Sequence, residues 1–329
     1  MQDVSLLLQA LPFLNQYKGK TFVVKVGGEL VADSAILEML AQDVCFLNKV
    51  GVRVVVIHGG GPQANELSER LGLKPTFVAG RRVTDEETLE VTKMVFAGKI
   101  NTEILSELRR FGGRAVGLSG VDGNVVHARR RPVKRMRDPE TGVLADVDFG
   151  HVGDIVQVDA ALLYTLLSHD YVPVLSSLGA DEDGHVYNIN ADTVAAEIAS
   201  ALAAEKLLIL TNVPGVLRSS DSREVVPNLT TAEARALMES GAVKKGMLPK
   251  LGAAVAAVER GVRHATILSG ILPHSILEET FTQRGSGTLV SRAPLPEPEP
   301  TIPPPRHPRK NRLWRKRKAA RQRAKAKAR

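Results

Sequence analysis

Two glycine-rich turns hold the residues best suited to chemistry in this chain of 329 residues. Lys25-Val26-Gly27-Gly28 ends one apolar run, and His58-Gly59-Gly60-Gly61 ends another. Glycines at such turns let backbone N–H groups approach an anion, and a lysine ammonium group adds a full positive charge. The turns therefore predict a site for a polyanion such as a phosphate chain. The alternative is that both are ordinary strand–helix turns.

Two familiar nucleotide motifs are matched only in part. Gly19-Lys20-Thr21 has the letters that end a Walker A loop, but Leu14 stands where that motif has its first glycine, and an apolar run follows the tripeptide instead of preceding it. Residues 59–64 fit a dinucleotide fingerprint, but the acidic residue expected about 20 positions later, at the end of a strand, is missing. We expect neither a P-loop nor a nicotinamide-dinucleotide site.

Four polar residues later in the chain could complete the site. Asn188 and Asn190 alternate along an extended segment, so their side chains face one way and could bind a polar ligand. Asp192 opens a predicted helix, where its alternative role is an N-cap. Lys250 also begins a predicted helix, where a cation is unfavourable unless an anion is bound nearby. The alternative for Lys250 is a solvated surface lysine.

Short apolar runs alternate with helical patterns along most of the chain, and this alternation must position the turns. We expect strands over about 21–26, 52–57, 115–118, 172–175, 206–210 and 264–268. Helices are expected over about 34–50, 62–71, 85–110, 159–169, 191–204, 231–239 and 248–261, and a hairpin-like region over about 124–158. The pattern predicts an α/β fold, an open and mainly parallel sheet with helices on both faces. Ligands of such sheets bind at the carboxyl ends of the strands, where both turns would lie.

Composition excludes several classes of protein. Apolar residues make up 43% of the chain, and no uncharged apolar run approaches the ~18 residues of a transmembrane helix. The first 14 residues contain no Lys or Arg, which argues against a secretory signal peptide. The one cysteine, Cys45, lies in an apolar helical pattern and is predicted to be part of the core. We expect a cytoplasmic protein without disulfides and without a membrane partner.

The two ends of the chain differ from its middle. Residues 4–17 predict a short amphipathic helix that Pro12 should kink. Residues 293–329 hold 13 basic and two acidic residues, a charge of +11, so residues 1–292 carry −3 of the total of +8. This tail is rich first in proline and then in lysine and arginine, and we expect it to be extended and disordered. It could bind polyanions, and the alternative is a solvated extension without function.

Six stretches give the chain a specific resemblance to the amino acid kinase family over about residues 4–291, and within it to the acetylglutamate kinases. They are VVKVGGEL (23–30), VVVIHGGGPQAN (54–65), GRRVTDEETLEVTKMVFAGKIN (80–101), VYNINAD (186–192), LTNVPGVL (210–217) and GMLPK (246–250). The glycine motifs are shared with carbamate kinases, aspartokinases and uridylate kinases. The RVTDEETLEV stretch, together with the paired asparagines, is what points to acetylglutamate.

The resemblance implies an enzyme that phosphorylates the side-chain carboxylate of N-acetyl-L-glutamate with ATP, an early step of arginine biosynthesis. It implies catalytic roles for Lys25, Lys250, Asp192, Gly27 and Gly28, with Asp192 holding both lysines. The resemblance further implies that the acceptor is bound by Gly59, Gly60, Arg82, Asn188 and Asn190. It implies that the nucleotide is bound by Thr211, Asn212, Val213, Gly215, Val216, Gly246 and Lys250. Asn212 and Lys245 depart from the family, which often has Asp and Gly there. Two lobes are implied, an acceptor lobe at about 21–180 and a nucleotide lobe at about 181–291.

This chemistry needs no general base, because a side-chain carboxylate with a pKa of ~4.3 is already ionised at neutral pH. His58 is then predicted to be structural. No cluster of His, Cys and acidic residues has metal-ligand spacing, so we expect Mg²⁺ to arrive with ATP, held largely by phosphates and water. Two alternatives remain: a kinase of a related carboxylate such as an aminoadipate derivative, and a catalytically silent amino-acid sensor.

The resemblance also implies regulation. In related proteins a kinked N-terminal helix, here residues 1–20, interlaces dimers into hexamers, and arginine binds beside it and inhibits. We expect a homohexamer built as a trimer of dimers, or at least a homodimer, with an arginine site at Tyr17, Glu279 and Gly285. Those relatives have a histidine where this chain has Thr266, and His264 lies on the same face of the strand, two positions away.

Overall fold

The computed structural model describes residues 2–78, 81–137, 144–219, 224–244, 246–282 and 285–294, and the statements below concern these residues. Residues 1–295 form one unit by their internal contacts. Lys245 and the tail from residue 295 onward lie outside the described residues, so what the sequence predicts for them stays a prediction.

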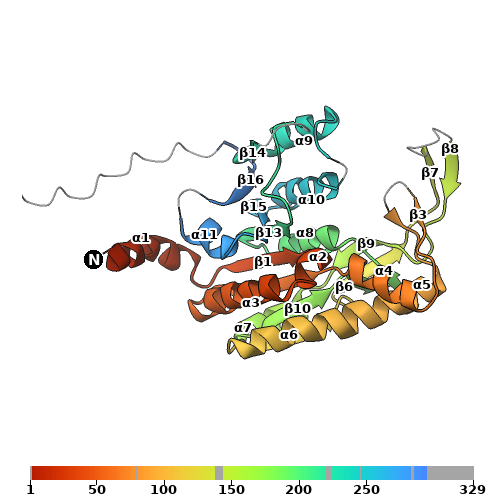
Figure 1. The fold of residues 1–329 in the computed structure, drawn as a ribbon, viewed down its shortest axis with the longest axis horizontal. Helices are drawn as coiled ribbons and strands as arrows, with labels where there is room; N and C mark the ends of the chain where they lie inside the picture. The colour runs from red at the N-terminus through yellow and green to blue at the C-terminus, as the bar shows by residue number, and fades with distance from the viewer. Residues whose placement is uncertain are drawn as a thin grey trace, which may run out of the picture. The chain divides into compact units, whose positions relative to one another are not determined.

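A sheet of eight strands runs through this unit (Figure 1). Its order is β14 (Asn228–Thr230), β16 (Gly287–Ser291), β15 (His264–Ser269), β13 (Lys206–Thr211), β1 (Thr21–Val26), β2 (Arg53–His58), β10 (Val172–Ser176) and β5 (Ala115–Ser119). Within it, β15 and β16 are antiparallel and the other neighbours are parallel. The six predicted strands are confirmed. Two further strands, β14 and β16, were not predicted and extend the sheet on the far side of β15.

Alternate residues of the central strands face two separate cores, one on each side of the sheet. Val23 of β1 belongs to the core formed with α7 (Ala161–Ser168), α8 (Ala191–Ala201), α9 (Thr231–Glu239) and α10 (Leu248–Glu259). Phe22 and Val24 belong to the other core, with α3 (Ser34–Lys49), α4 (Gly61–Arg70), α6 (Asn101–Arg110) and α11 (Ser275–Phe281). Helices therefore cover both faces, as predicted. By the same alternation, Lys25 projects to the face of Val23, toward α8.

The predicted hairpin-like region supplies half of the strands of the smaller sheets, which lie to the right in Figure 1. A four-stranded sheet has the order β12 (Val186–Asn188), β11 (Leu178–Ala180), β6 (Val126–Arg130) and β9 (Gly153–Val158). Two further pairs are β7 (Lys134–Arg137) with β8 (Leu144–Val147), and β3 (Phe77–Val78) with β4 (Arg81–Arg82). These sheets put Arg82 and Asn188 at one end of the cleft described below.

The long helix predicted over 85–110 consists of three parts. These are α5 (Glu86–Lys93), a π-helix (Met94–Ile100) and α6. A π-helical turn changes the direction in which the following side chains point, and such turns often occur at functional sites. Here the π-helix ends directly before Asn101, whose side chain reaches into the sheet.

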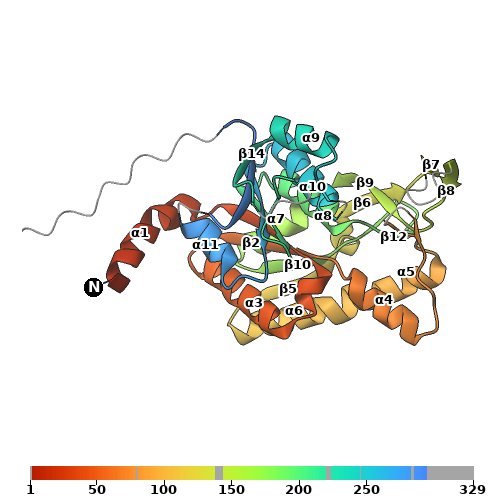
Figure 2. The ribbon, with the colours of Figure 1, turned by 45° about the horizontal axis from the view of Figure 1, so that its top comes forward.

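Three more helices frame the unit. The predicted N-terminal helix is α1 (Gln2–Tyr17), which contains Pro12 and packs beside α11 (Figures 1 and 2). The short helix α2 (Gly28–Val31) follows the first glycine turn directly, and neither α2 nor α11 was predicted. None of the helices in the described ranges is both long and apolar enough to cross a membrane.

Candidate active site

A cleft of about 1080 Å³ lies where β1, β2 and β13 end. Its lining includes every residue for which a catalytic, acceptor-binding or nucleotide-binding role was predicted: Lys25, Gly27, Gly28, Gly59, Gly60, Arg82, Asn188, Asn190, Asp192, Thr211, Asn212, Val213, Gly215, Val216, Gly246 and Lys250. The fold thus brings these residues into one cavity, while their individual roles stay predictions.

Asp192 lies between the two lysines at the centre of this cleft. Its Oδ1 is 2.8 Å from Nζ of Lys25, and its Oδ2 is 3.2 Å from Nζ of Lys250. Lys25 reaches it from the end of β1, and Lys250 from the first turn of α10. The side chains of Lys25 and Asp192 are each 5% exposed, against 21% for Lys250. One carboxylate therefore fixes two ammonium groups, one of them more open to the cleft.

The charges of this trio depend on one another. Burial lowers the pKa of the Lys25 ammonium, and Asp192 opposes that effect. Burial alone would raise the pKa of Asp192, but the two lysines hold it below its ordinary value. Two cations on one anion leave a net positive charge in a poorly solvated place. An incoming polyanion would favour the charged form of Lys25 further.

The two glycine turns pack directly on one another. A Cβ on Gly28 would lie 3.0 Å from Cα of Gly60, and a Cβ on Gly60 would lie 2.2 Å from Cδ1 of Ile100. Within the described ranges, the backbone N–H groups of Gly28 and Gly60 donate to no recorded acceptor. These glycines are therefore needed for close packing, and their N–H groups remain available to a ligand.

Arg82, Asn188 and Asn190 line the part of the cleft where acceptor binding was predicted. Arg82 donates from Nη2 to the carbonyl oxygen of Gly61 (2.9 Å) and to Oδ1 of Asn65, while its buried Nη1 has no partner among the described residues. Burial lowers the pKa of the Arg82 guanidinium. A partly buried guanidinium with an unused N–H group on a cleft wall suits a carboxylate ligand.

The two asparagines differ in what they do. Asn188 donates from Nδ2 to Oγ1 of Thr84 at 3.2 Å. Oδ1 of Asn190 accepts from the backbone N–H groups of Asp192 (2.9 Å) and Thr193 (3.1 Å). Asn190, and not Asp192, is therefore the N-cap of α8, which leaves the Asp192 carboxylate free for the lysines.

The segment after β13 and the start of α10 line the part of the cleft where nucleotide binding was predicted. Asn212 donates from Nδ2 to Oε2 of Glu29 at 2.7 Å. Gly215 has a φ of 154°, and a Cβ there would lie 2.8 Å from Oγ1 of Thr288, which accepts from the N–H of Val216 at 2.9 Å. Thr288 thus fixes this loop from β16, a contact that no sequence motif indicates.

His58 is buried in the sheet, and its side chain contacts that of Asn101, a residue for which no role was predicted. Asn101 lies with Nδ2 3.3 Å from Nε2 of His58 and donates to the carbonyl oxygen of Val174 at 3.0 Å. Nδ1 of His58 lies 3.2 Å from the carbonyl oxygen of Gly59. Burial lowers the pKa of His58 to about 4, so the imidazole is neutral at pH 7. These contacts suit the predicted structural role of His58, since the His58–Asn101 pair links β2, β10 and α6.

The residues of the predicted arginine site also lie together, away from the cleft. Glu279 accepts from Oγ1 of Thr266 (3.0 Å) and from the N–H of Ser286 (2.9 Å), and its Oε1 is 3.7 Å from Nζ of Lys206. Nζ of Lys206 lies 5.1 Å from the ring centroid of Tyr17, and a Cβ on Gly285 would lie 2.9 Å from Oε2 of Glu279. Thr266, not His264, is the recorded partner of Glu279 on this strand.

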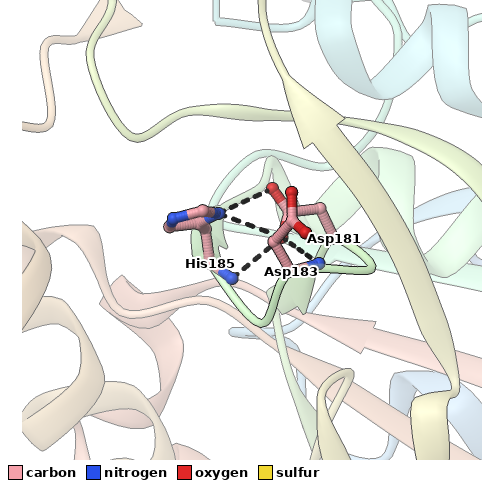
Figure 3. A group of neighbouring side chains, drawn as sticks. All are labelled: Asp181, Asp183 and His185. Atoms are coloured by element: carbon pink, nitrogen blue, oxygen red, sulfur yellow. Dashed lines mark hydrogen bonds and ion pairs between the residues drawn. The ribbon is translucent and has the colours of Figure 1, made fainter.

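Contrary to the expectation from the sequence, one group of side chains among the described residues has the spacing of a metal site (Figure 3). Asp181, Asp183 and His185 lie on the turn between β11 and β12, and Nδ1 of His185 is 3.2 Å from Oδ2 of Asp181. Tyr187 also donates to Oδ2 of Asp181, at 2.6 Å. The hydrogen bonds within the turn account for this group without an ion.

Two lysines on one buried aspartate, beside free N–H groups at the carboxyl edge of a parallel sheet, define a phosphotransferase with an αβα architecture. The chain belongs to the amino acid kinase family, whose family model matches residues 20–269.

Curated relatives match nearly the whole folded part of the chain. The chain is 45% identical over 293 residues to an acetylglutamate kinase from Methanocaldococcus jannaschii. The matched region covers 89% of this chain and 97% of that protein. An acetylglutamate kinase from Halorhodospira halophila is 46% identical, with coverages of 88% and 95%.

Solved structures give the same architecture. N-acetylglutamate synthase from Neisseria gonorrhoeae, complexed with coenzyme A and N-acetyl-glutamate, matches with a TM-score of 0.76 and 30% identity, over 89% of this chain and 64% of that chain. This protein therefore spans about two thirds of that structure's length. Carbamate kinase from Giardia lamblia, bound to AMP-PNP, has a TM-score of 0.60 at 17% identity over 84% of this chain and 99% of that chain, a likeness of fold alone.

Proposed function

We propose that this protein uses ATP to phosphorylate the side-chain carboxylate of N-acetyl-L-glutamate, giving an acyl phosphate in an early step of arginine biosynthesis. The observation that carries the proposal is the Lys25–Asp192–Lys250 trio, which lies in one cleft between an acceptor end and a nucleotide end. The curated relatives, which are named for acetylglutamate, support this choice of acceptor.

The barrier to this reaction is electrostatic. The acceptor carboxylate is already an anion and needs no base, but it must approach a polyanion. Lys25 and Lys250 would neutralise charge on the transferring phosphoryl group, and the N–H groups of Gly28 and Gly60 would donate to its oxygens. Asp192 would act as a positioning residue. Mg²⁺, brought in by ATP, supplies further neutralisation of the phosphates.

The acceptor would be fixed at its other carboxylate. Arg82 lines the cleft and provides a charged group there, and its buried Nη1 has no hydrogen-bond partner among the described residues. Asn188 would bind the amide portion through its side-chain Oδ1, to which no described residue donates, while its Nδ2 bonds to Thr84. Holding both ends of the acceptor brings its side-chain carboxylate in line with the phosphoryl group.

Measuring ADP release with a panel of acceptors tests the proposal. Acetylglutamate should support turnover at a much higher kcat/KM than glutamate, aspartate or aminoadipate. A preference for an aminoadipate derivative would replace the proposed acceptor. Nucleotide and acetylglutamate binding without any turnover would instead favour the silent sensor.

We propose a cytoplasmic homohexamer or homodimer, with arginine as inhibitor. The α1–α11 contact and the cluster around Glu279 support a regulatory role for this end of the molecule. Size-exclusion chromatography with light scattering at micromolar concentration tests the assembly, and a monomer would contradict it. Titrating arginine to ~10 mM at subsaturating acetylglutamate tests the inhibition. Glu279→Ala should abolish inhibition while sparing kcat, because the catalytic groups lie elsewhere.

A further inference from the structure

Glu29 is the carboxylate of the cleft that forms no ion pair with a described residue. Three acidic residues line the cavity in the described part of the chain: Glu29, Asp192 and Glu197. Asp192 holds the two lysines, and Glu197 pairs with Arg260. For Glu29, no Lys, Arg or His nitrogen among the described residues lies within 4.0 Å, so it forms no ion pair in the described ranges, and its only recorded influence on a cation is that it raises the pKa of the Lys25 ammonium at longer range.

The fold places Glu29 at the nucleotide end. It lies in α2, directly after Gly28, and β1 is the parallel neighbour of β13. The ends of these two strands therefore meet, and Oε2 of Glu29 accepts from Nδ2 of Asn212 at 2.7 Å. Thr211, the last residue of β13, lies with Oγ1 3.4 Å from Oδ1 of Asn212. A carboxylate, an amide and a hydroxyl thus share one rim of the cleft.

A bare carboxylate in this place opposes the function of the cleft. Nearby phosphates and Glu29 would repel each other, and the low dielectric of a closed site strengthens that repulsion. A divalent cation between them turns the repulsion into attraction. Mg²⁺ takes oxygen ligands, usually one or two carboxylates together with phosphates and water. The oxygen donors on this rim fit that requirement.

We propose that Glu29 is a protein ligand of the divalent cation that accompanies the nucleotide, either directly or through a bound water, with the Asn212 side chain orienting it. This inference rests on the proposed use of ATP and adds one protein ligand to a cation otherwise held by phosphates and water. It assigns Glu29 to binding of the metal–nucleotide complex and leaves the acceptor end unaffected.

The test compares ADP binding with and without Mg²⁺ by isothermal titration calorimetry of the full chain. For the wild type, Mg²⁺ should tighten ADP binding. In Glu29→Gln that enhancement should fall by about tenfold, the scale of one lost charge-assisted contact. Metal-free ADP should bind Glu29→Gln at least as tightly as the wild type, because the repulsion is gone. Asn212→Asp, which adds a second carboxylate, should increase the enhancement.

Controls separate this inference from the proposed function. Glu69→Gln makes the same change at an exposed position on α4 outside the cleft and should leave both dissociation constants unchanged. An unchanged Mg²⁺ enhancement in Glu29→Gln, or an equal loss of affinity with and without Mg²⁺, would overturn the role of Glu29. If instead Mg²⁺-dependent ADP binding behaves as expected but acetylglutamate is not phosphorylated, the proposed acceptor is wrong and the role of Glu29 stands.

Discussion

Oδ1 of Asp192 lies 2.8 Å from Nζ of Lys25 in a place where both side chains are 5% exposed. The same carboxylate holds Lys250 through its other oxygen. A buried ion pair costs desolvation energy and is weak evidence for stability. The arrangement is better explained by the reaction, which needs two cations held apart at fixed positions before the phosphates arrive.

Removing any member of this trio should damage turnover more than binding. Lys25→Ala and Lys250→Ala should each lower kcat by roughly 10²-fold or more, because each removes positive charge from the transition state. Asp192→Asn should have a similar effect by misplacing both lysines. Steady-state kinetics with Lys74→Ala as an exposed control would check this, and near-normal kcat in the three variants contradicts the assignment.

Arg82→Ala should mainly raise the KM for acetylglutamate, because the guanidinium would bind the acceptor equally in the ground and transition states. The variant also loses the contacts of Arg82 with Gly61 and Asn65, which should loosen the second glycine turn, so kcat should fall slightly. Arg70→Ala, at the far end of α4, is the matched control. A large fall in kcat with an unchanged KM would mean that Arg82 contacts the phosphoryl group instead.

His58 should make the fold sensitive to acid. Burial lowers its pKa from 6.5 to about 4, so between these values the unfolded chain binds a proton that the folded chain does not. The contribution of His58 to the free energy of unfolding is therefore fully present above pH 6.5. It decreases as the pH falls and is lost as the pH passes through 4, by about 3 kcal/mol in total. Urea unfolding of the wild type and His58→Asn across this range should show a shallower pH dependence in the variant. Equal slopes would contradict the depressed pKa.

The basic tail should bind polyanions without sequence preference. Its 13 basic residues would release counterions from RNA or DNA, so binding should largely disappear by ~0.3 M salt. Deleting residues 293–329 should remove this binding and leave kinase activity intact. Fluorescence anisotropy with a random-sequence RNA measures the first effect. Loss of activity in a folded deletion variant would mean that the boundary at residue 292 is wrong.

The strands and turns were predictable because their signals are local. Lys25 and the glycine turns follow short apolar runs, and the period of those runs identifies the strands without knowledge of the fold. The role of Asn190 as the cap of α8 was missed, since Asn190 and Asp192 both suit a helix start and only the position of Lys25 decides between them.

Other features depend on contacts between distant parts of the chain. Asn101 reaches His58 only because a π-helical segment precedes it, and no composition signal distinguishes that segment from an ordinary helix. The Glu29–Asn212 contact requires β1 to pair with β13, which the sequence leaves undetermined. The edge strand β14 has only three residues, and β16 joins the sheet by pairing with both β14 and β15. Thr288 of β16 fixes the loop at Val216, which is distant in the sequence.

In the proposed reaction the side-chain carboxylate of acetylglutamate becomes an acyl phosphate. Incubating the protein with MgATP, acetylglutamate and hydroxylamine traps such a product as its hydroxamate, which is then quantified by mass spectrometry. We predict hydroxamate in proportion to the ADP released, dependent on acetylglutamate and lost in Lys25→Ala. ADP release without hydroxamate, or hydroxamate that forms equally well in Lys25→Ala, would contradict the account.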